Sequence, residues 1–314
     1  MDIYKLNKNT LNQVSEIPFI LEKDIQSLFE ANISDIFGYV FVSTEFTISE
    51  YRIDTLCFDE ENSSFVIVEY KRGSSYSVID QGYSYLSTML NNKAEFILEY
   101  NEKNDATLKR DEVNWTNSKV IFISPSFNSY QKNSVNFKDV PFELWEIKRF
   151  EGDIICLEQH KATSKESIEK ISGDNLIVSV SKEVKAYQEE DIIARSNDPT
   201  KKIWEQLKEK LLELNDTEIV IQSNYIKYTK NGKGVCYFNF RKGYIKGEII
   251  RGNINPDGSK SKNFFQIDDP KGLCKEYNFT YKSGVEGHRY LFTINESVDL
   301  DYIEMIIKQK YKSI

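Results

Sequence analysis

Apolar positions in the first half of the chain follow helical and strand-like patterns in turn. Apolar residues recur at helical spacing from Leu21 to Ile36, after Pro18, which suits a first helical turn, and again from Val78 to Leu90. Short runs of apolar and β-favouring residues, bounded by turn residues, predict strands. These runs cover residues 52–58, 65–71, 120–123, 142–147 and 154–157. The run 120–123 has no polar alternation, which is typical of a strand buried on both faces.

The second half begins with a strong helical signal. Asp198 is the candidate N-cap, Pro199 suits the first helical residue, and apolar residues line one face from Ile203 to Leu214. Strand-like runs follow at 218–222, 235–241 and 244–250, and a final apolar stripe predicts a helix over 301–311. Helices at both ends of a run of strands favour a small α+β domain.

A chain of 314 residues suggests two domains. We expect an α/β N-terminal domain over 1–158, a polar connecting segment over 159–190, and a smaller α+β C-terminal domain over 191–314. Residues 1–190 carry a net charge of −12, whereas residues 191–314 carry +4. A charge asymmetry of this size suggests modules with different partners.

Composition excludes several classes of function. The two histidines, His160 and His288, are too few for a His-rich metal site, and the four cysteines contain no C-x-x-C pair. No apolar run approaches the roughly 18 residues that a membrane-spanning helix needs. We therefore expect a cytoplasmic protein with reduced cysteines and no membrane partner.

Three acids and one lysine of the first half fall at positions that share a face with apolar residues. Glu22 lies on the apolar stripe of the first helix, and Asp54 alternates with apolar strand residues. Glu69 and Lys71 alternate with apolar residues of the next strand in the same way. Isolated charges in such surroundings cost several kcal/mol, so they need partners.

A divalent cation is a suitable partner for several carboxylates. Mg²⁺ prefers oxygen ligands, commonly one or two carboxylates, and completes its coordination with water and substrate phosphate. A lysine beside it would help to offset the charge that develops when a phosphodiester is cleaved. The pattern therefore predicts a site for Mg²⁺, with Mn²⁺ as a possible substitute, made by Glu22, Asp54 and Glu69.

Asp54 followed by Glu69-Tyr70-Lys71 resembles the D…E-x-K signature of the PD-(D/E)XK nuclease superfamily. Gln81 and Tyr85 resemble the Gln-x-x-x-Tyr element of its RecB-like and NucS-like members. The resemblance covers about residues 15–150 and departs in one respect, because Asp54 follows isoleucine and not proline. It implies a restriction-endonuclease-like fold with a central mixed sheet flanked by helices.

The resemblance also implies roles for these residues. Asp54, Glu69, Lys71 and Gln81 would be catalytic in a Mg²⁺-dependent endodeoxyribonuclease, while Tyr85 and Arg72 would contact nucleic acid. The two-part layout is also similar to a bacterial family of uncharacterised proteins called predicted transport proteins, although no membrane segment supports that name. A homodimer is a possible assembly, because two sites cut two strands more readily.

Other interpretations of the same residues remain open. The four charged side chains could form a salt-bridged cluster without a metal, in a nuclease-like fold that binds nucleic acid or a protein without cutting, as in a defence or repair assembly. Gln81 and Tyr85 could merely cap or pack. Glu45, which precedes the strand of Asp54, is interpreted as structural.

Basic residues gather in the second half with aromatic residues between them. The candidates for contact with nucleic acid are Lys227, Lys230, Lys233, Arg241, Lys242 and Lys246. Basic side chains would neutralise phosphates, and exposed aromatic rings would stack on bases. The alternative, slightly favoured, is a solvated set of hairpins whose aromatic residues face the core.

Overall fold

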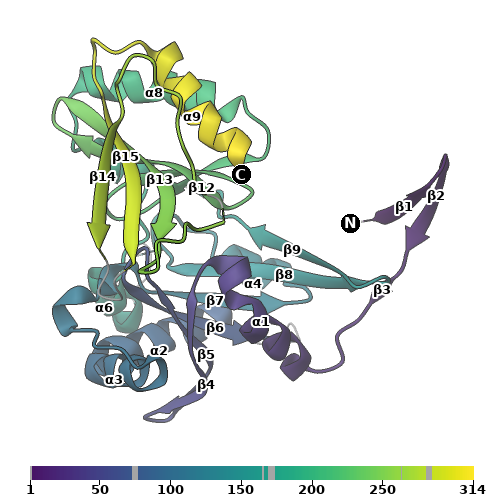
Figure 1. Cartoon of the computed structure of the whole chain (residues 1–314). Coiled ribbons are helices and arrows are strands. Elements are labelled where there is room, and N and C mark those ends of the chain that lie inside the picture. The colour runs from purple at the N-terminus through teal and green to yellow at the C-terminus, as the bar shows by residue number, and fades with distance from the viewer. Residues whose placement is uncertain (1, 73–76, 165, 169–173, 263, 281–284) are drawn as a thin grey trace. The chain divides into compact units, whose positions relative to one another are not determined.

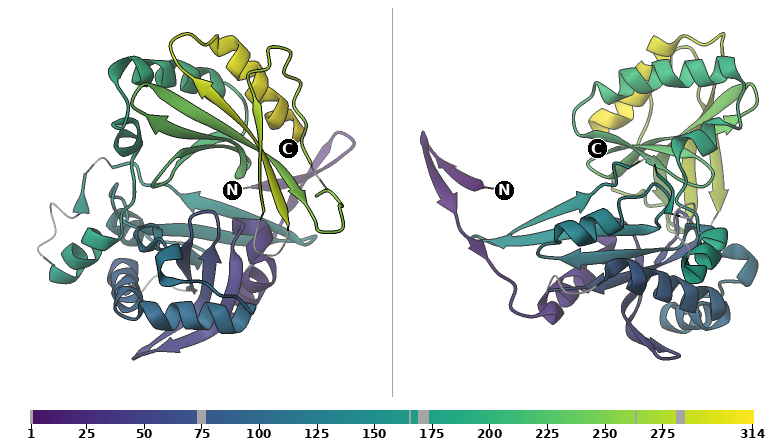
Figure 2. Two further views of the ribbon diagram at one scale, coloured as in Figure 1. Left: turned by 60° about the vertical axis from the view of Figure 1, so that its left-hand side comes forward. Right: turned by 180° about the vertical axis from the view of Figure 1, so that it is seen from behind.

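A computed structural model describes residues 2–72, 77–164, 166–168, 174–262, 264–280 and 285–314. The chain forms two compact units, Met1–Ala186 and Tyr187–Ile314. Figure 1 shows both units, and Figure 2 shows them from two further sides. Each unit is described by itself below.

The N-terminal unit is built on a mixed sheet of seven strands. Six strands follow the order β3-β8-β7-β6-β5-β4, and β9 pairs with β8. The central strands β6, β7 and β8 are parallel, whereas β4, β5 and β6 pair antiparallel. The strands are β3 (Glu16–Ile17), β4 (Val40–Ile48), β5 (Tyr51–Asp59), β6 (Ser64–Tyr70), β7 (Lys119–Ser124), β8 (Phe142–Phe150) and β9 (Ile154–His160).

Helices cover the two faces of this sheet. On one face α1 (Glu22–Phe37) buries Ile25, Phe29 and Ile33, and Gly38 ends the helix with a positive φ of 73° that glycine adopts at little cost. The opposite face packs against α2 (Val78–Asn91) and α3 (Lys93–Asn104). Shorter elements complete the unit: α4 (Ser129–Ser134) and the 3-10 turns η1 (Arg110–Glu112) and η2 (Trp115–Asn117).

Part of the predicted connecting segment belongs to the N-terminal unit. Helix α6 (Asn175–Glu183) packs on the α2 side of the sheet, where Val180 and Val184 are buried in the core. The first unit therefore extends to Ala186, beyond the predicted boundary at 158. Residues 165 and 169–173 of the predicted segment lie outside the described residues.

The N-terminal residues form a separate two-stranded sheet. Strands β1 (Ile3–Asn7) and β2 (Thr10–Val14) pair antiparallel with each other. Figure 1 shows this strand pair joined to the rest of its unit through β3. It was absent from the pattern-based prediction because its apolar positions are few.

The C-terminal unit is an antiparallel sheet of six strands with the order β10-β11-β12-β13-β15-β14. Trp204 on α8 and Ile303 and Ile306 on α9 are buried against the sheet. Helix α7 (Glu189–Ile193) begins the unit, and α8 (Asp198–Leu212) and α9 (Leu300–Ser313) follow. The strands are β10 (Thr217–Ile221), β11 (Ile226–Lys230), β12 (Lys233–Arg241), β13 (Tyr244–Ile254), β14 (Lys275–Thr280) and β15 (Glu286–Ile294).

The structure confirms the predicted fold class: a mixed central sheet with helices in the N-terminal part, and a separate antiparallel sheet with a final helix. Several local predictions were wrong. Asn197, and not Asp198, caps α8, because its side chain accepts the N–H of Thr200. The first helix begins at Glu22, four residues after Pro18.

None of the helices in the described part of the chain combines the length and the apolar character that crossing a bilayer requires.

Candidate active site

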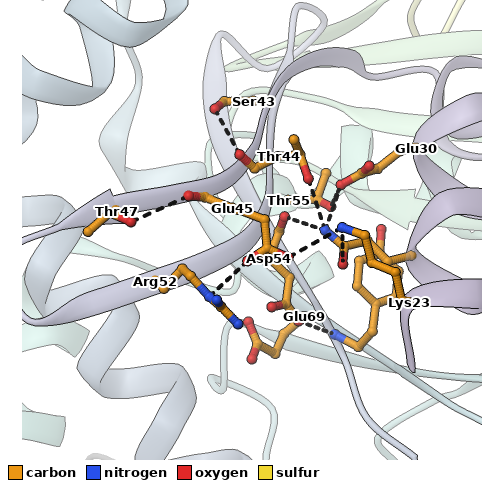
Figure 3. Close-up of polar contacts among 12 residues, drawn as sticks. Lys23, Glu30, Ser43, Thr44, Glu45, Thr47, Arg52, Asp54, Thr55 and Glu69 are labelled. Atoms are coloured by element: carbon orange, nitrogen blue, oxygen red, sulfur yellow. Dashed lines mark hydrogen bonds and ion pairs between the residues drawn. The ribbon is translucent and has the colours of Figure 1, made fainter. Parts of the chain in front are cut away.

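The strand pair β5–β6 positions the two central acids. Regular pairing of these strands ends at Thr55 and Val68, and beyond that point Asp54 Oδ2 accepts the backbone N–H of Tyr70 at 3.1 Å. Because the carboxylate replaces a strand-to-strand hydrogen bond, its position relative to Glu69 is determined by the backbone. Asp54 and Glu69 lie next to each other, as Figure 3 shows. The strand ladder thus orients both acids toward the α2 side of the sheet.

Glu69 is the most deeply buried acid of the cluster, with 3% of its surface exposed. Its Oε1 contacts Lys71 Nζ at 2.8 Å and accepts the side-chain N–H of Gln81 at 3.1 Å. Its Oε2 is buried and has no hydrogen-bond partner among the described residues, and the same holds for Gln81 Oε1. An unpartnered buried oxygen costs about 1–3 kcal/mol, so two of them close together favour a bound group.

Helix α2 approaches the sheet closely enough for Gln81 to reach Glu69. Gly82 makes this approach possible, because a Cβ at this position would lie 2.6 Å from the ring of Phe142. Ser77 caps the helix by accepting the N–H of Asp80. Gln81 Nε2 also lies 3.0 Å from the hydroxyl oxygen of Tyr85. The glutamine therefore links α2 to the end of β6.

Burial controls the proton affinity of the two acids. It raises the pKa of Glu69 to about 7, with a further contribution from the nearby charge of Asp54 and partial compensation by Lys71. Burial also raises the pKa of Asp54, which the N–H of Tyr70 and the charge of Lys71 oppose. Both acids therefore hold a proton more tightly than exposed carboxylates, and a second positive charge would lower their pKa values.

Glu22 does not face apolar surroundings as the helical stripe predicted. It is the exposed first residue of α1, and its Oε1 accepts the backbone N–H of Arg72 at 2.7 Å. The side chain of Arg72 is itself exposed. In the described part of the chain, no group of three or more His, Cys, Asp or Glu side chains is arranged to hold a metal ion. Asp54 and Glu69 thus lie together, whereas Glu22, whose charge still acts on Asp54, binds the backbone of Arg72.

Residues that were not predicted from the sequence support the site on the α1 side of the sheet. Gln26 is buried on α1, and its Nε2 donates to the backbone oxygen of Asp54 at 2.9 Å and to Thr44 and Glu30. Thr55 donates to the same Glu30 carboxylate at 2.6 Å. Figure 3 labels Glu30, Thr44 and Thr55, which belong to this network. Gln26 directly follows Ile25 of the apolar stripe, and this position was the only signal in the sequence that Gln26 is buried.

Glu45, interpreted as structural from the sequence, lies at the edge of the site. Its φ of 52° is unusual for a residue with a side chain. The carboxylate of Glu45 lies 2.8 Å from Arg52 Nε and 3.4 Å from Lys23 Nζ. Tyr85 is buried, and its hydroxyl lies 3.4 Å from the backbone oxygen of Arg52, so this side chain also holds β5 in place. Burial raises the pKa of Tyr85, which keeps the phenol protonated.

The predicted basic residues of the C-terminal unit have different surroundings. Lys230 Nζ donates to the backbone oxygens of Tyr311 and Ile314, at the C-terminal end of α9, which is a structural role. Lys227 is partly buried and lies over the ring of Tyr237, 5.6 Å from its centre. Lys246 is partly buried as well, whereas the exposed members of the predicted set are Lys233, Arg241 and Lys242.

The aromatic residues between these bases divide between the two faces of the sheet. Tyr228 and Phe240 are buried in the core, as the slightly favoured alternative predicted. Tyr225 and Tyr237 instead pack edge to face with their ring centres 5.5 Å apart, and both are only partly buried. Tyr244 is exposed. Part of the aromatic set therefore lies on the face that carries Lys227.

The residues present fit a divalent cation of the Mg²⁺ type. Mg²⁺ is commonly bound through one or two carboxylates, with water and phosphate in the other positions. Asp54 and Glu69 supply two neighbouring carboxylates, and one oxygen of Glu69 is buried without a hydrogen-bond partner among the described residues. The donor set contains oxygen only, which suits Mg²⁺ or Mn²⁺ better than Zn²⁺.

Comparison with known proteins finds a full-length relative. The chain is 42% identical to a protein of Haemophilus influenzae described as uncharacterised, over 315 residues that cover 99% of this chain and 100% of the relative. No family model and no solved structure matches the chain.

Proposed function

The chain belongs to the same family as the uncharacterised Haemophilus influenzae protein, and we propose that its N-terminal unit is a metal-dependent nuclease of the PD-(D/E)XK type that hydrolyses phosphodiester bonds of DNA. The supporting observation is the group of buried Glu69 and Lys71 with partly buried Asp54 and Gln81, in which one oxygen of Glu69 and one of Gln81 have no hydrogen-bond partner among the described residues. Such a group is costly without a bound cation and substrate.

Two carboxylates would hold the cation. Asp54 and Glu69 are the proposed ligands, and Mg²⁺ or Mn²⁺ bound there would polarise a water molecule and offset phosphate charge. Glu22 is proposed to act indirectly, because its hydrogen bond to the backbone of Arg72 fixes the segment that follows Lys71. The original expectation of three ligating acids is thus reduced to two.

Lys71 and Gln81 are proposed to handle the reacting groups. The ammonium of Lys71 lies 2.8 Å from Glu69 and would stabilise the negative charge that develops on the phosphate oxygens. Gln81 donates through Nε2 to Glu69, which leaves its Oε1 to accept a hydrogen bond from the attacking water. That water would lose a proton to solvent and form the new P–O bond as the bond to the leaving sugar oxygen breaks, and the leaving oxygen would receive a proton from solvent.

The test is cleavage of supercoiled plasmid by the full chain in Mg²⁺, Mn²⁺, Ca²⁺ or EDTA. We expect nicking in Mg²⁺ and Mn²⁺ only, and its loss by at least about 100-fold in Asp54→Asn and Lys71→Met. Asp35→Asn and Lys103→Met make the same chemical changes at exposed positions and serve as matched controls. Circular dichroism verifies that all four variants are folded.

Two results would contradict the proposal. Equal cleavage by the wild type and by Asp54→Asn would identify a contaminating nuclease. DNA binding in a gel-shift assay without cleavage in any metal would instead support the alternative, a nuclease-like module that binds nucleic acid without cutting it.

A further inference from the structure

Helices α8 and α9 cover one face of the antiparallel sheet in the C-terminal unit (Figure 1). Trp204 of α8 and Ile303 of α9 pack into the same core as Phe238 and Ile249 of the sheet. Because side chains alternate along a strand, the positions between these core residues point to the opposite face. In β13 and β15, which are both fully described, none of those alternate side chains belongs to the buried core.

The opposite face is defined by four residues that the strand registers place next to one another. Tyr237 of β12 pairs with Glu248 of β13, and Tyr277 of β14 pairs with Arg289 of β15. Arg289 in turn pairs with Ile250, two residues beyond Glu248, so all of these side chains point the same way. The face that carries Tyr237, Glu248, Tyr277 and Arg289 is called the tyrosine face below.

The strands place more positive than negative charge on the tyrosine face. By register and alternation, its basic residues are Lys227, Arg241, Lys246, Lys275 and Arg289, and its acidic residues are Glu218 and Glu248. Glu248 is already paired with Arg289, whose Nη1 lies 2.6 Å from its carboxylate. Residues 1–190, by contrast, carry a net charge of −12. A polyanion is therefore attracted to the tyrosine face and repelled by the first half of the chain.

Aromatic rings lie among these charges. Tyr277 exposes 51% of its surface and Tyr244, which shares the face through its pairing with Arg241, exposes 41%. The guanidinium of Arg289 lies 4.2 Å from the ring centre of Phe279 and 5.4 Å from that of Tyr277. Because Arg289 is held by its ion pair, both rings of β14 are positioned before any ligand binds, which lowers the entropic cost of binding.

The shape of the tyrosine face suits an extended ligand. The cavity on it has a volume of about 60 Å³ and is lined in part by Ile250, Asn253 and Phe279. Sites for small molecules commonly measure about 300–1,000 Å³, so this cavity is too small for one. Ile250 lies in the same row as Tyr277, and Tyr244 lies six residues before it on β13, a distance of about 20 Å. A ligand that reaches both tyrosines must therefore lie along the sheet.

We propose that the tyrosine face binds single-stranded DNA. Bases stack on Tyr277 and Tyr244, and phosphates pair with Lys246 and Arg241. In a duplex the bases are already stacked on one another, so these rings would have no free base to bind. The choice of DNA over RNA rests on the proposed function of the N-terminal unit, whereas the binding surface itself does not depend on that function.

The first test is fluorescence anisotropy of a labelled single strand of about 20 nucleotides, longer than one module of this kind covers, with the full chain in EDTA. We expect tighter binding of the single strand than of a duplex of the same length. Tyr277→Ala should raise Kd roughly 5- to 150-fold, the effect of losing one stacked base, whereas Tyr277→Phe keeps the ring and should bind like the wild type. Tyr4→Ala removes a tyrosine of similar exposure, 49%, from the N-terminal strand pair and serves as the matched control.

Salt dependence and photochemistry locate the contact. Lys246→Ala should lower the slope of log affinity against log salt by about 1, and Lys202→Ala, which removes an exposed lysine of α8, should leave it unchanged. A strand that contains 5-iodouracil should crosslink under ultraviolet light to peptides with Tyr277 or Tyr244. Circular dichroism verifies that the variants are folded.

Several results would overturn the proposal. These are no binding of the single strand, equal or tighter binding of the duplex, an affinity that neither Tyr277→Ala nor Lys246→Ala changes, and crosslinks confined to the N-terminal unit. Tighter binding of an RNA strand would overturn the choice of DNA. Because the assay contains EDTA, Lys71→Met should bind like the wild type, so loss of cleavage and loss of binding are separate results.

Discussion

The protonation of Glu69 directly measures what it costs to bury the ionised carboxylate. Burial and the neighbouring Asp54 raise the pKa of this carboxyl to about 7, from its ordinary value of 4.5. We expect its titration to be observable by carbon NMR of chain labelled at the glutamate carboxyl carbons. The resonance that is absent from Glu69→Gln identifies the group. In EDTA its midpoint should lie near pH 7, well above that of exposed glutamates.

The same pKa difference predicts how stability depends on pH. A carboxyl whose pKa is higher in the folded state binds more protons there, so its contribution to stability is complete below about pH 4.5 and is lost as pH rises through 7. At 1.36 kcal/mol per pKa unit, the loss is about 3 kcal/mol. Between pH 5 and pH 8 the wild type should therefore lose about 2–3 kcal/mol relative to Glu69→Gln.

This comparison has an internal control. Packing differences between Glu69 and glutamine are the same at both pH values and cancel in the difference, whereas the attraction of Lys71 for ionised Glu69 is already contained in the pKa of Glu69. Urea denaturation in EDTA at pH 5 and pH 8 supplies the four free energies of unfolding that are needed. Mg²⁺ should then stabilise the wild type at pH 8 by about 2.7 kcal/mol when its concentration is 100 times Kd, and should have less effect on Glu69→Gln.

Two outcomes would refute this reasoning. A titration midpoint between pH 4 and pH 5 in EDTA would mean that Lys71 and Gln81 satisfy the carboxylate fully, so that no cation is needed. A midpoint near pH 7 that does not fall when Mg²⁺ or Mn²⁺ is added would mean that the site is strained for a reason other than metal binding.

Further predictions concern packing and nucleic-acid contact. Gly82→Ala should destabilise the N-terminal unit by about 1–3 kcal/mol in urea denaturation, because the new Cβ would overlap the ring of Phe142; little or no change would contradict the close approach of α2. Trp204→Ala should cost the C-terminal unit about 3–5 kcal/mol, seen by calorimetry as a lower transition for that unit alone, because this side chain is fully buried. If the C-terminal sheet contacts DNA, Lys227→Ala combined with Lys246→Ala should lower the slope of log affinity against log salt by about 2 in fluorescence anisotropy; an unchanged slope would exclude these two contacts.

The local patterns that the sequence carries account for most of the secondary structure and for half of the site. Side chains two residues apart on a strand share a face whatever the fold, so the neighbourhood of Glu69 and Lys71 followed from their spacing. Gln81 lies one turn before Tyr85 in a helix with a clear apolar stripe, and their side-chain contact was predictable for the same reason.

Features that depend on partners far away in the chain were not predictable in this way. Glu22 occupies the position that its helical spacing predicted, but α1 begins there, and so its side chain reaches the backbone of Arg72 instead of the core. The buried role of Gln26 depends on the strand that α1 covers. The hairpin of β1 and β2 has too few apolar residues to show a clear pattern.

The amino-acid sequence by itself thus determined which residues alternate, which helices have apolar faces, and which acid and lysine are neighbours, because these relations span only a few residues. Only the tertiary structure decided how deeply Glu69 is buried, which oxygens lack a partner among the described residues, and which aromatic residues of the C-terminal sheet face its core. Burial and pairing depend on residues that are distant in sequence, and those contacts exist only once the sheet has formed.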